Sequence, residues 1–159
     1  MVEIRAIGDH EFEFLFDLVY EAAYIPDGIE RPPKSFVYEP QVSRYVENFG
    51  RKGDIAFVLV DGHEFVGGIW SRLFAGDNRG HGFVDESTPE LGMAVFDGYR
   101  NRGYGTQLMQ RLIDELISHG FGKVSLSVDR RNPALRLYER FGFELVRETG
   151  NAYTMVKTL

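Results

Sequence analysis

The sequence contains no cysteine, so it cannot form a disulfide framework, a thiolate metal site or a cysteine nucleophile. It also has no apolar run that approaches the roughly 18 residues of a membrane-spanning helix. The segment Met1–Gly8 carries Glu3 and Arg5 and lacks the apolar stretch of a signal peptide. We therefore expect a cytoplasmic protein without a membrane partner.

Positive charge is scarce, with 18 lysines and arginines against 24 aspartates and glutamates and a net charge of −6. A chain this acidic does not wrap a polyanion over its whole surface, so we expect no nucleic-acid partner. Any anion must then be bound by a local cluster of donors. The four histidines lack metal-ligand spacing, and we expect no metal site.

Apolar residues are plentiful, since 43% of the 159 residues are hydrophobic and 14% are aromatic. This composition suits one packed core. Together with the mixture of strands and helices predicted below, it indicates a single α+β domain over residues 1–159. Apolar periodicity predicts strands at 2–7, 54–60, 64–73, 90–96, 123–128, 143–147 and 152–157. It predicts helices at 10–24, 39–49, about 105–119 and 132–140. Asp61-Gly62 predicts a hairpin turn, and Gly67-Gly68 predicts an interruption of the third strand.

The long helix has a broad apolar face and begins after a glycine-rich loop. Its predicted buried stripe comprises Leu108, Met109, Leu112, Ile113, Leu116 and Ile117. Gly103 and Gly105 would let a phosphate approach the free amides of the first helical turn. Arg100 and Arg102 could add charge-assisted contacts. The alternative is a tight turn with solvated arginines.

Two other phosphate-binding motifs are absent. No Gly-Lys-Ser/Thr occurs, which excludes a P-loop, and Leu108 stands where a dinucleotide-binding fingerprint needs its third glycine. The chain is also short for the two nucleotide-binding halves of that fold.

The loop Arg100–Gly105 resembles the Arg/Gln-x-x-Gly-x-Gly/Ala signature of the GNAT superfamily of N-acetyltransferases. The segment Asn132–Phe143 resembles that family's Asn-x-x-Ala-x-x-Leu-Tyr-x-x-x-Gly-Phe motif, with Ala134 one place early, and Glu90–Val95 resembles its fourth strand. The resemblance implies a single-domain GNAT-like fold: a central mixed, mostly antiparallel twisted sheet of six to seven strands with about four helices. It also implies an acetyl-CoA-binding core at 55–157, an acceptor-side segment at 1–54 and a possible homodimer.

The resemblance further implies that acetyl-CoA is the cosubstrate and where it binds. Loop amides and arginines would bind the pyrophosphate, the edge of the fourth strand would pair with the pantetheine amides, and Asn132 would contact the cofactor. The implied cofactor-binding residues are Met93, Ala94, Val95, Arg100, Arg102, Gly103, Tyr104, Gly105, Thr106 and Asn132.

Amine acetylation needs a base for the ammonium group and benefits from an acid for the departing thiolate. Tyr138 is the candidate acid, although its spacing from Leu135 and Phe141 equally suits a core position. Glu90 is the candidate base, with Asp85 and Glu86 as rivals. Without cysteine or a Gly-x-Ser-x-Gly elbow, direct attack in a ternary complex is preferred.

The predicted function is transfer of acetyl from acetyl-CoA to a primary amine of a small molecule or protein. The alternative is a non-catalytic acyl-CoA-binding sensor or interaction module. Four aromatic residues flank the Pro-rich segment and would either line the acceptor pocket or seal the loop against the sheet: Tyr20, Tyr24, Phe36 and Tyr38. Sealing is favoured. His81 could also contact substrate.

Overall fold

The computed structural model describes residues 1–159. Its strands are β1 (Val2–Ala6), β2 (Ile55–Asp61), β3 (Glu64–Arg72), β4 (Glu90–Val95), β5 (Lys123–Asp129), β6 (Glu144–Thr149) and β7 (Ala152–Thr158). Its α-helices are α1 (Phe14–Ala22), α2 (Pro40–Ser43), α3 (Tyr104–Ser118) and α4 (Leu135–Arg140), with 3-10 turns at Asp9–Glu11 and Lys34–Tyr38. None of these helices is long and apolar enough to cross a membrane.

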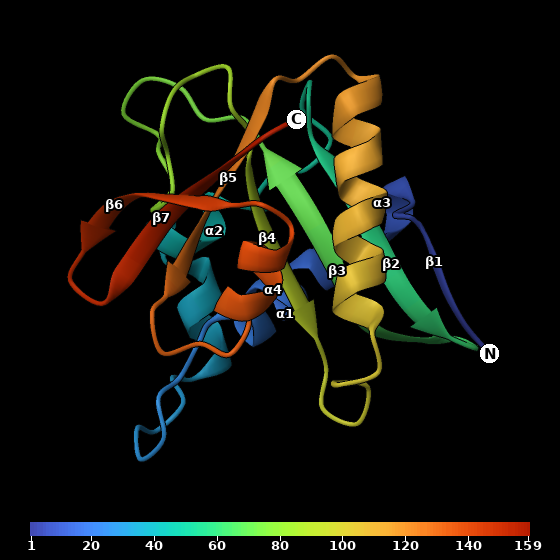
Figure 1. Cartoon of the computed structure of the whole chain (residues 1–159). Coiled ribbons are helices and arrows are strands. Elements are labelled where there is room, and N and C mark those ends of the chain that lie inside the picture. The colour runs from blue at the N-terminus through green and yellow to red at the C-terminus, as the bar shows by residue number, and fades with distance from the viewer.

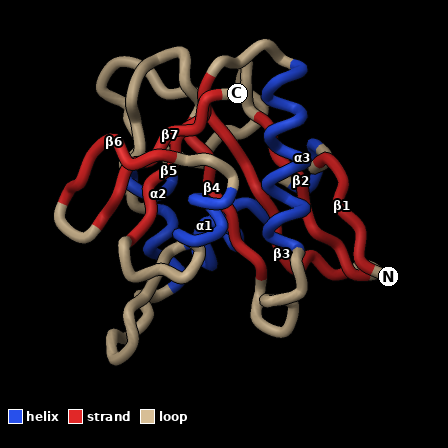
Figure 2. Tube along the Cα trace, viewed as in Figure 1, coloured by secondary structure: helices blue, strands red, loops and turns tan.

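All seven strands form one sheet in the order β1-β2-β3-β4-β5-β7-β6. Neighbouring strands are antiparallel except β4 and β5, which are parallel. This mixed, mostly antiparallel sheet with four helices confirms the predicted fold class. Figure 2 shows the strands as one continuous layer with helices on both sides.

The sheet divides the core into two layers, and helices cover each of them (Figure 1). On one face, α3 packs Leu108, Leu112 and Leu116 against the sheet, and Tyr138 of α4 joins the same cluster. On the other face, α1 and the segment around α2 form a second cluster that includes Trp70. The sheet therefore carries a helical layer on each side, and any opening between strands lies between these layers.

The sequence-based boundaries were wrong at the second helix, which ends at Ser43 rather than near residue 49. The reason is a pair of tertiary hydrogen bonds, because the buried guanidinium of Arg72 donates to the carbonyls of Arg44 and Glu47. Those carbonyls face the sheet, and the chain turns instead of continuing the helix. The first helix is also shorter than predicted because a 3-10 turn precedes it and α1 begins only at Phe14.

The third strand is not interrupted at Gly67-Gly68, contrary to the prediction. Both glycines lie in the ladder, where a Cβ atom would come within 2.8 Å of the carbonyl oxygen of Ala94 or Phe57. They are needed for close strand approach, and the irregularity falls next to them at Val66. The predicted stripe on α3 was also too wide, since Ile117 is 53% exposed.

Candidate active site

A cleft opens where β4 and β5 separate. The two strands pair only at Glu90 and Ser125, and Ser125 N–H donates to the carbonyl of Pro89 at 2.9 Å. Beyond that pair the strands diverge, with α4 lying over the opening (Figure 1). The cleft has a volume of about 1420 Å³ and is lined by both strands, the start of α3, α4 and residues from the N-terminal segment.

The edge of β4 presents free backbone groups to this cleft. Phe96 N–H donates to Val66 on β3, so the alternation of an antiparallel ladder directs Ala94 toward β3 and Met93 and Val95 toward β5. β5 does not pair with these two residues. The side chain of Arg100 donates a hydrogen bond to the Val95 carbonyl at 2.7 Å. Met93 and the Val95 N–H therefore remain for an amide-bearing ligand, whereas the Ala94 backbone does not face the cleft.

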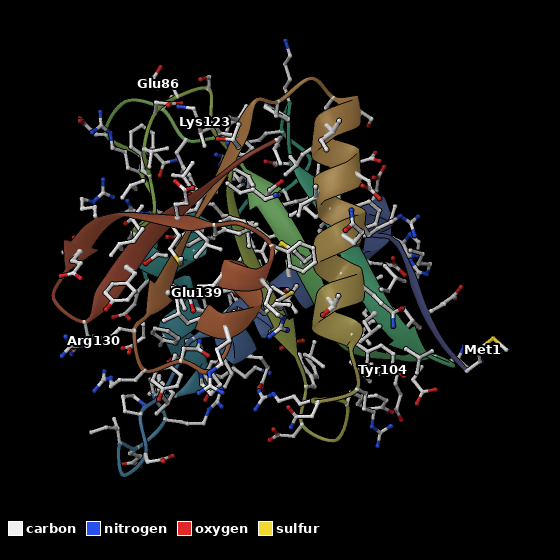
Figure 3. The ribbon with its side chains drawn as sticks, in the orientation of Figure 1. Met1, Glu86, Tyr104, Lys123, Arg130 and Glu139 are labelled. Atoms are coloured by element: carbon white, nitrogen blue, oxygen red, sulfur yellow. The ribbon has the colours of Figure 1, made fainter.

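The start of α3 lines the same cleft and carries unpaired amides. Gly103 precedes the helix with φ +85°, a left-handed conformation that favours glycine. No acceptor in the protein receives the N–H groups of Arg102, Gly103, Tyr104, Gly105 and Thr106. These donors and the positive end of the helix dipole suit a phosphate group. Figure 3 shows Tyr104 at this helix start.

The arginines predicted to bind the cofactor have partners of their own. Arg100 forms an ion pair with Asp97 at 2.9 Å, and Arg102 lies over the Tyr99 ring at 5.7 Å. Three arginines that sequence reasoning missed line the cleft without an ion-pair partner: Arg130, Arg136 and Arg140. Figure 3 shows Arg130 at the far end of β5, across the opening from Tyr104. The sequence did contain a signal for these arginines, because three exposed positive charges occur within the Asn132–Phe143 segment or just before it.

The Asn132 side chain shapes the turn before α4 instead of capping the helix directly. Its Oδ1 accepts from the Ala134 N–H at 2.9 Å, and α4 begins at Leu135, so the expected helix start was early. Asn132 lines the cleft, and no protein atom receives its amide nitrogen. The geometry is compatible with a second hydrogen bond to a ligand.

Tyr138 of α4 belongs to the core and also lines the cleft, so it has both of the positions that the sequence left open. Its ring packs edge-to-face on Phe143 at 5.9 Å within the core, and the side chain also lines the cleft. Its hydroxyl makes no hydrogen bond within the protein. Burial raises the pKa of Tyr138 to about 12, so the hydroxyl keeps its proton at neutral pH.

Glu90 of β4 is a carboxylate that lines the cleft and is deeply buried, with 2% of its surface exposed. One oxygen, Oε2, accepts from the Tyr45 hydroxyl at 2.8 Å and from Gly82 N–H at 3.1 Å. The other, Oε1, has no partner. Burial raises the pKa of Glu90 to about 7, against the lowering effect of these two hydrogen bonds. A carboxyl group in this state can accept a proton near neutral pH.

The rival carboxylates lie outside the cleft and bind their own loop. Asp85 accepts from Ser87, and Glu86 accepts from the Gly76 N–H at 3.0 Å. Figure 3 places Glu86 at the opposite end of the molecule from Tyr104. His81 does line the cleft and stacks on Tyr45, and burial lowers the pKa of His81. Sequence reasoning missed Tyr45, which orients Glu90 and carries no local motif.

The four aromatic residues of the N-terminal segment divide between the two expected roles. Tyr20 seals the loop by donating from its hydroxyl to the Pro32 carbonyl at 2.8 Å. Tyr38 stacks on Phe16 and is 62% exposed. Tyr24 and Phe36 line the cleft.

The open strand edge of β4 and the free amides at the start of α3 thus line one cleft, and the side chains of Tyr138 and Glu90 line it as well. Residues 15–143 match the Acetyltransferase (GNAT) family, and the chain belongs to that family. It is therefore an acetyl-CoA-dependent acyltransferase, as the resemblance of its two motifs predicted.

Solved structures share the fold. The PaiA N-acetyltransferase of Thermoplasma acidophilum, determined in complex with coenzyme A, superposes with a TM-score of 0.72 at 18% identity, over 100% of this chain and 99% of that one. An acetyltransferase of the GNAT family from Streptococcus pneumoniae gives a TM-score of 0.67 at 16% identity, over the whole of both chains.

One curated relative is similar in sequence over part of the chain. The mycothiol acetyltransferase of Corynebacterium aurimucosum is 35% identical over 68 residues, which is 40% of this chain. The aligned part spans only 22% of that longer protein.

Proposed function

We propose that the protein transfers an acetyl group from acetyl-CoA to a primary amine by direct attack within a ternary complex. The observation that carries the proposal is the pair of backbone features in one cleft: the four unpaired amides from Gly103 to Thr106 and the free edge of β4 at Met93. A diphosphate and an amide-bearing arm need these two kinds of partner.

The acid and the base would act from opposite faces of the sheet. Tyr138 belongs to the layer with α3, whereas the Glu90 carboxyl lies in the layer with α1 and α2, against Tyr45. Because β4 and β5 separate, the opening between them is accessible to both layers. Bound acetyl-CoA supplies the acetyl thioester. Glu90 would receive a proton from the ammonium group, directly or through water, which leaves a neutral amine able to attack the thioester carbonyl. As the C–S bond breaks, Tyr138 would give its proton to the departing thiolate and regain one, directly or through water, from the nitrogen that has attacked.

Backbone donors at the cleft would also stabilise negative charge on the reacting carbonyl oxygen. The N–H of Val95 points toward β5 and has no strand partner there. A fixed donor of this kind is favourable because it needs no reorganisation during the reaction.

We further propose the division of the chain into an acceptor-side segment at 1–54 and a cofactor core at 55–157. Support comes from the lining of the cleft: the first segment contributes Val19, Phe36 and Tyr45, and the second contributes β4, β5 and the start of α3. The division predicts that substitutions before residue 55 change acceptor preference more than acetyl-CoA affinity.

Isothermal titration with acetyl-CoA tests the proposal directly. We expect saturable one-site binding, followed by amine-dependent release of coenzyme A in a thiol assay. No binding at millimolar acetyl-CoA would refute the assignment of the cofactor site. Binding without acetylated product across a panel of amines would instead favour a sensor of acyl-CoA.

A further inference from the structure

The cleft carries positive charge that nothing in the protein neutralises. Six arginines line it, and three of them face a carboxylate within 3.9 Å: Arg31, Arg100 and Arg131. The other three form no ion pair and donate no side-chain hydrogen bond within the protein: Arg130, Arg136 and Arg140. A guanidinium group stays protonated at neutral pH. On a chain with a net charge of −6, free cations gathered in one cleft indicate that an anion binds there.

Two of these arginines lie on one face of α4. Arg136 and Arg140 are one helical turn apart, a spacing at which Cβ atoms are about 5–6 Å from each other, so both side chains can reach the same anion. Tyr138, which lies between them in sequence, is buried in the core, whereas both arginines are exposed. The two residues, here called the arginine pair, therefore border the cleft from its solvent side.

The arginine pair also adjoins the start of α3. A Cβ atom on Gly105 would lie 3.3 Å from Cδ2 of Leu137, so α4 packs directly beside the first turn of α3 (Figure 1). Leu137 follows Arg136 directly and precedes Arg140 by three residues, so this contact brings both arginines close to α3. The arginine pair and the four unpaired amides from Gly103 to Thr106 thus border the same part of the cleft.

The cosubstrate of this family carries an anion of the right kind. Acetyl-CoA has a diphosphate and, in addition, a third phosphate, which is a monoester on the 3′-oxygen of its ribose. The diphosphate is joined to the 5′-oxygen of the same ribose, so the third phosphate lies one sugar ring away from the group that we assign to the α3 amides. A phosphate monoester has a charge of about −1.5 to −2 at pH 7 and three oxygens that accept hydrogen bonds. The fixed N–H donors of arginine match such oxygens.

The acceptor is a less suitable source of this anion. α4 packs with α3 on one face of the sheet, whereas the residues that we assign to the acceptor belong to the N-terminal segment on the other face. An anionic group of the acceptor would have to cross the opening between β4 and β5 to touch the arginine pair. The ribose phosphate starts on the face where α3 and α4 lie.

We propose that Arg136 and Arg140 bind the 3′-phosphate of acetyl-CoA. This site makes the enzyme select ligands that carry the third phosphate over ligands that end in an unphosphorylated ribose. Arg130 is not part of the site, because it lies at the far end of β5, across the opening from Tyr104 (Figure 3). The inference rests on the acetyl transfer proposed above, with its diphosphate position at α3, and adds a second anion-binding site to it.

Isothermal titration with coenzyme A and with 3′-dephospho-coenzyme A tests the inference, because the two compounds differ only in the third phosphate. For the wild type we expect the Kd of the dephospho compound to be about tenfold higher, the combined effect of two charge-assisted contacts at an exposed site. The double variant Arg136→Gln/Arg140→Gln should raise the Kd of coenzyme A about tenfold and change that of the dephospho compound less than about twofold. Glutamine has nearly the helix propensity of arginine, so α4 should remain folded.

Arg130→Gln is the matched control, since it removes the same charge from the same cleft and should leave the ratio of the two Kd values unchanged. A wild-type ratio near one, or a ratio that the double variant retains, would overturn the inference. An equal fall of the ratio in Arg130→Gln would also overturn it, because the selectivity would then come from the overall positive charge of the cleft.

These outcomes are separate from the fate of the proposed acetyl transfer. In each of them both compounds still bind, so the cofactor site at α3 stands whether or not the third phosphate is recognised. Binding of neither compound would refute that cofactor site, and the inference would fail with it.

Discussion

Replacing Glu90 with glutamine should change how the stability of the protein depends on pH. Burial raises the pKa of Glu90 to about 7 from an ordinary value of 4.5. Between these two pH values the unfolded chain releases the Glu90 proton while the folded protein retains it. The unfolded state therefore binds fewer protons, and the free energy of unfolding falls as pH rises through this range. Above about pH 7 both states are ionised, and the contribution no longer changes.

The size of the effect follows from the same two values. A difference of about 2.5 pH units, at about 1.36 kcal/mol per unit, corresponds to a loss of about 3 kcal/mol between pH 4.5 and 8. Glutamine has the shape of the protonated acid, and its oxygen can still accept from Tyr45 and Gly82. Glu90→Gln should therefore remove this loss without changing the packing.

Urea unfolding of both proteins at pH 4.5, 6 and 8 measures the effect. All other titrating groups contribute equally to the two profiles, so the difference between the profiles isolates Glu90. We expect the wild type to lose about 3 kcal/mol more than the variant over this range. Parallel profiles would show that Glu90 titrates normally, and the argument for a base poised near neutral pH would fail. In the wild type kcat/KM should also rise with pH through about 7.

Three further predictions concern the cofactor site, the acid and the fold. Gly103→Asp should raise the Kd for acetyl-CoA at least about tenfold above that of Gly103→Ala, which shares the backbone strain at φ +85° but not the charge; equal Kd values by titration would make the loop a simple turn. Tyr138→Phe should lower kcat about 100-fold with unchanged acetyl-CoA affinity and nearly unchanged thermal stability, and wild-type turnover would return Tyr138 to a core role. Arg72→Ala should cost about 3–5 kcal/mol in denaturant unfolding because it leaves Asp54 buried without its 2.7 Å partner; a cost below 1 kcal/mol would contradict this.

Local sequence signals predicted several of the residues that line the cleft. The glycine loop precedes α3 as expected, and Tyr138 lines the cleft with most of the backbone groups assigned to the cofactor. These residues belong to two continuous segments in which strand, turn and helix signals follow one another along the chain. Their geometry depends mainly on near neighbours in sequence, so a pattern of residue types is enough to predict it.

The other face of the cleft, which we propose receives the acceptor, was not predictable in the same way. Tyr45 is 45 residues from Glu90 in sequence yet donates to its carboxylate, and Gly82 approaches from another loop. Trp70 reaches the opening only because its partner on β4 is Gly92. No periodicity or motif reports such contacts, since each depends on which strands become neighbours.

The sequence by itself therefore determined the order of elements, the family motifs and the glycine loop before α3, because these follow from local backbone preference and from spacing along the chain. Tertiary structure decided where α2 ends, which carboxylate is buried enough to hold a proton near pH 7, and which polar atoms lack partners. The physical reason is that burial, desolvation and hydrogen bonds between distant segments exist only after the sheet has brought β3, β4 and β5 side by side.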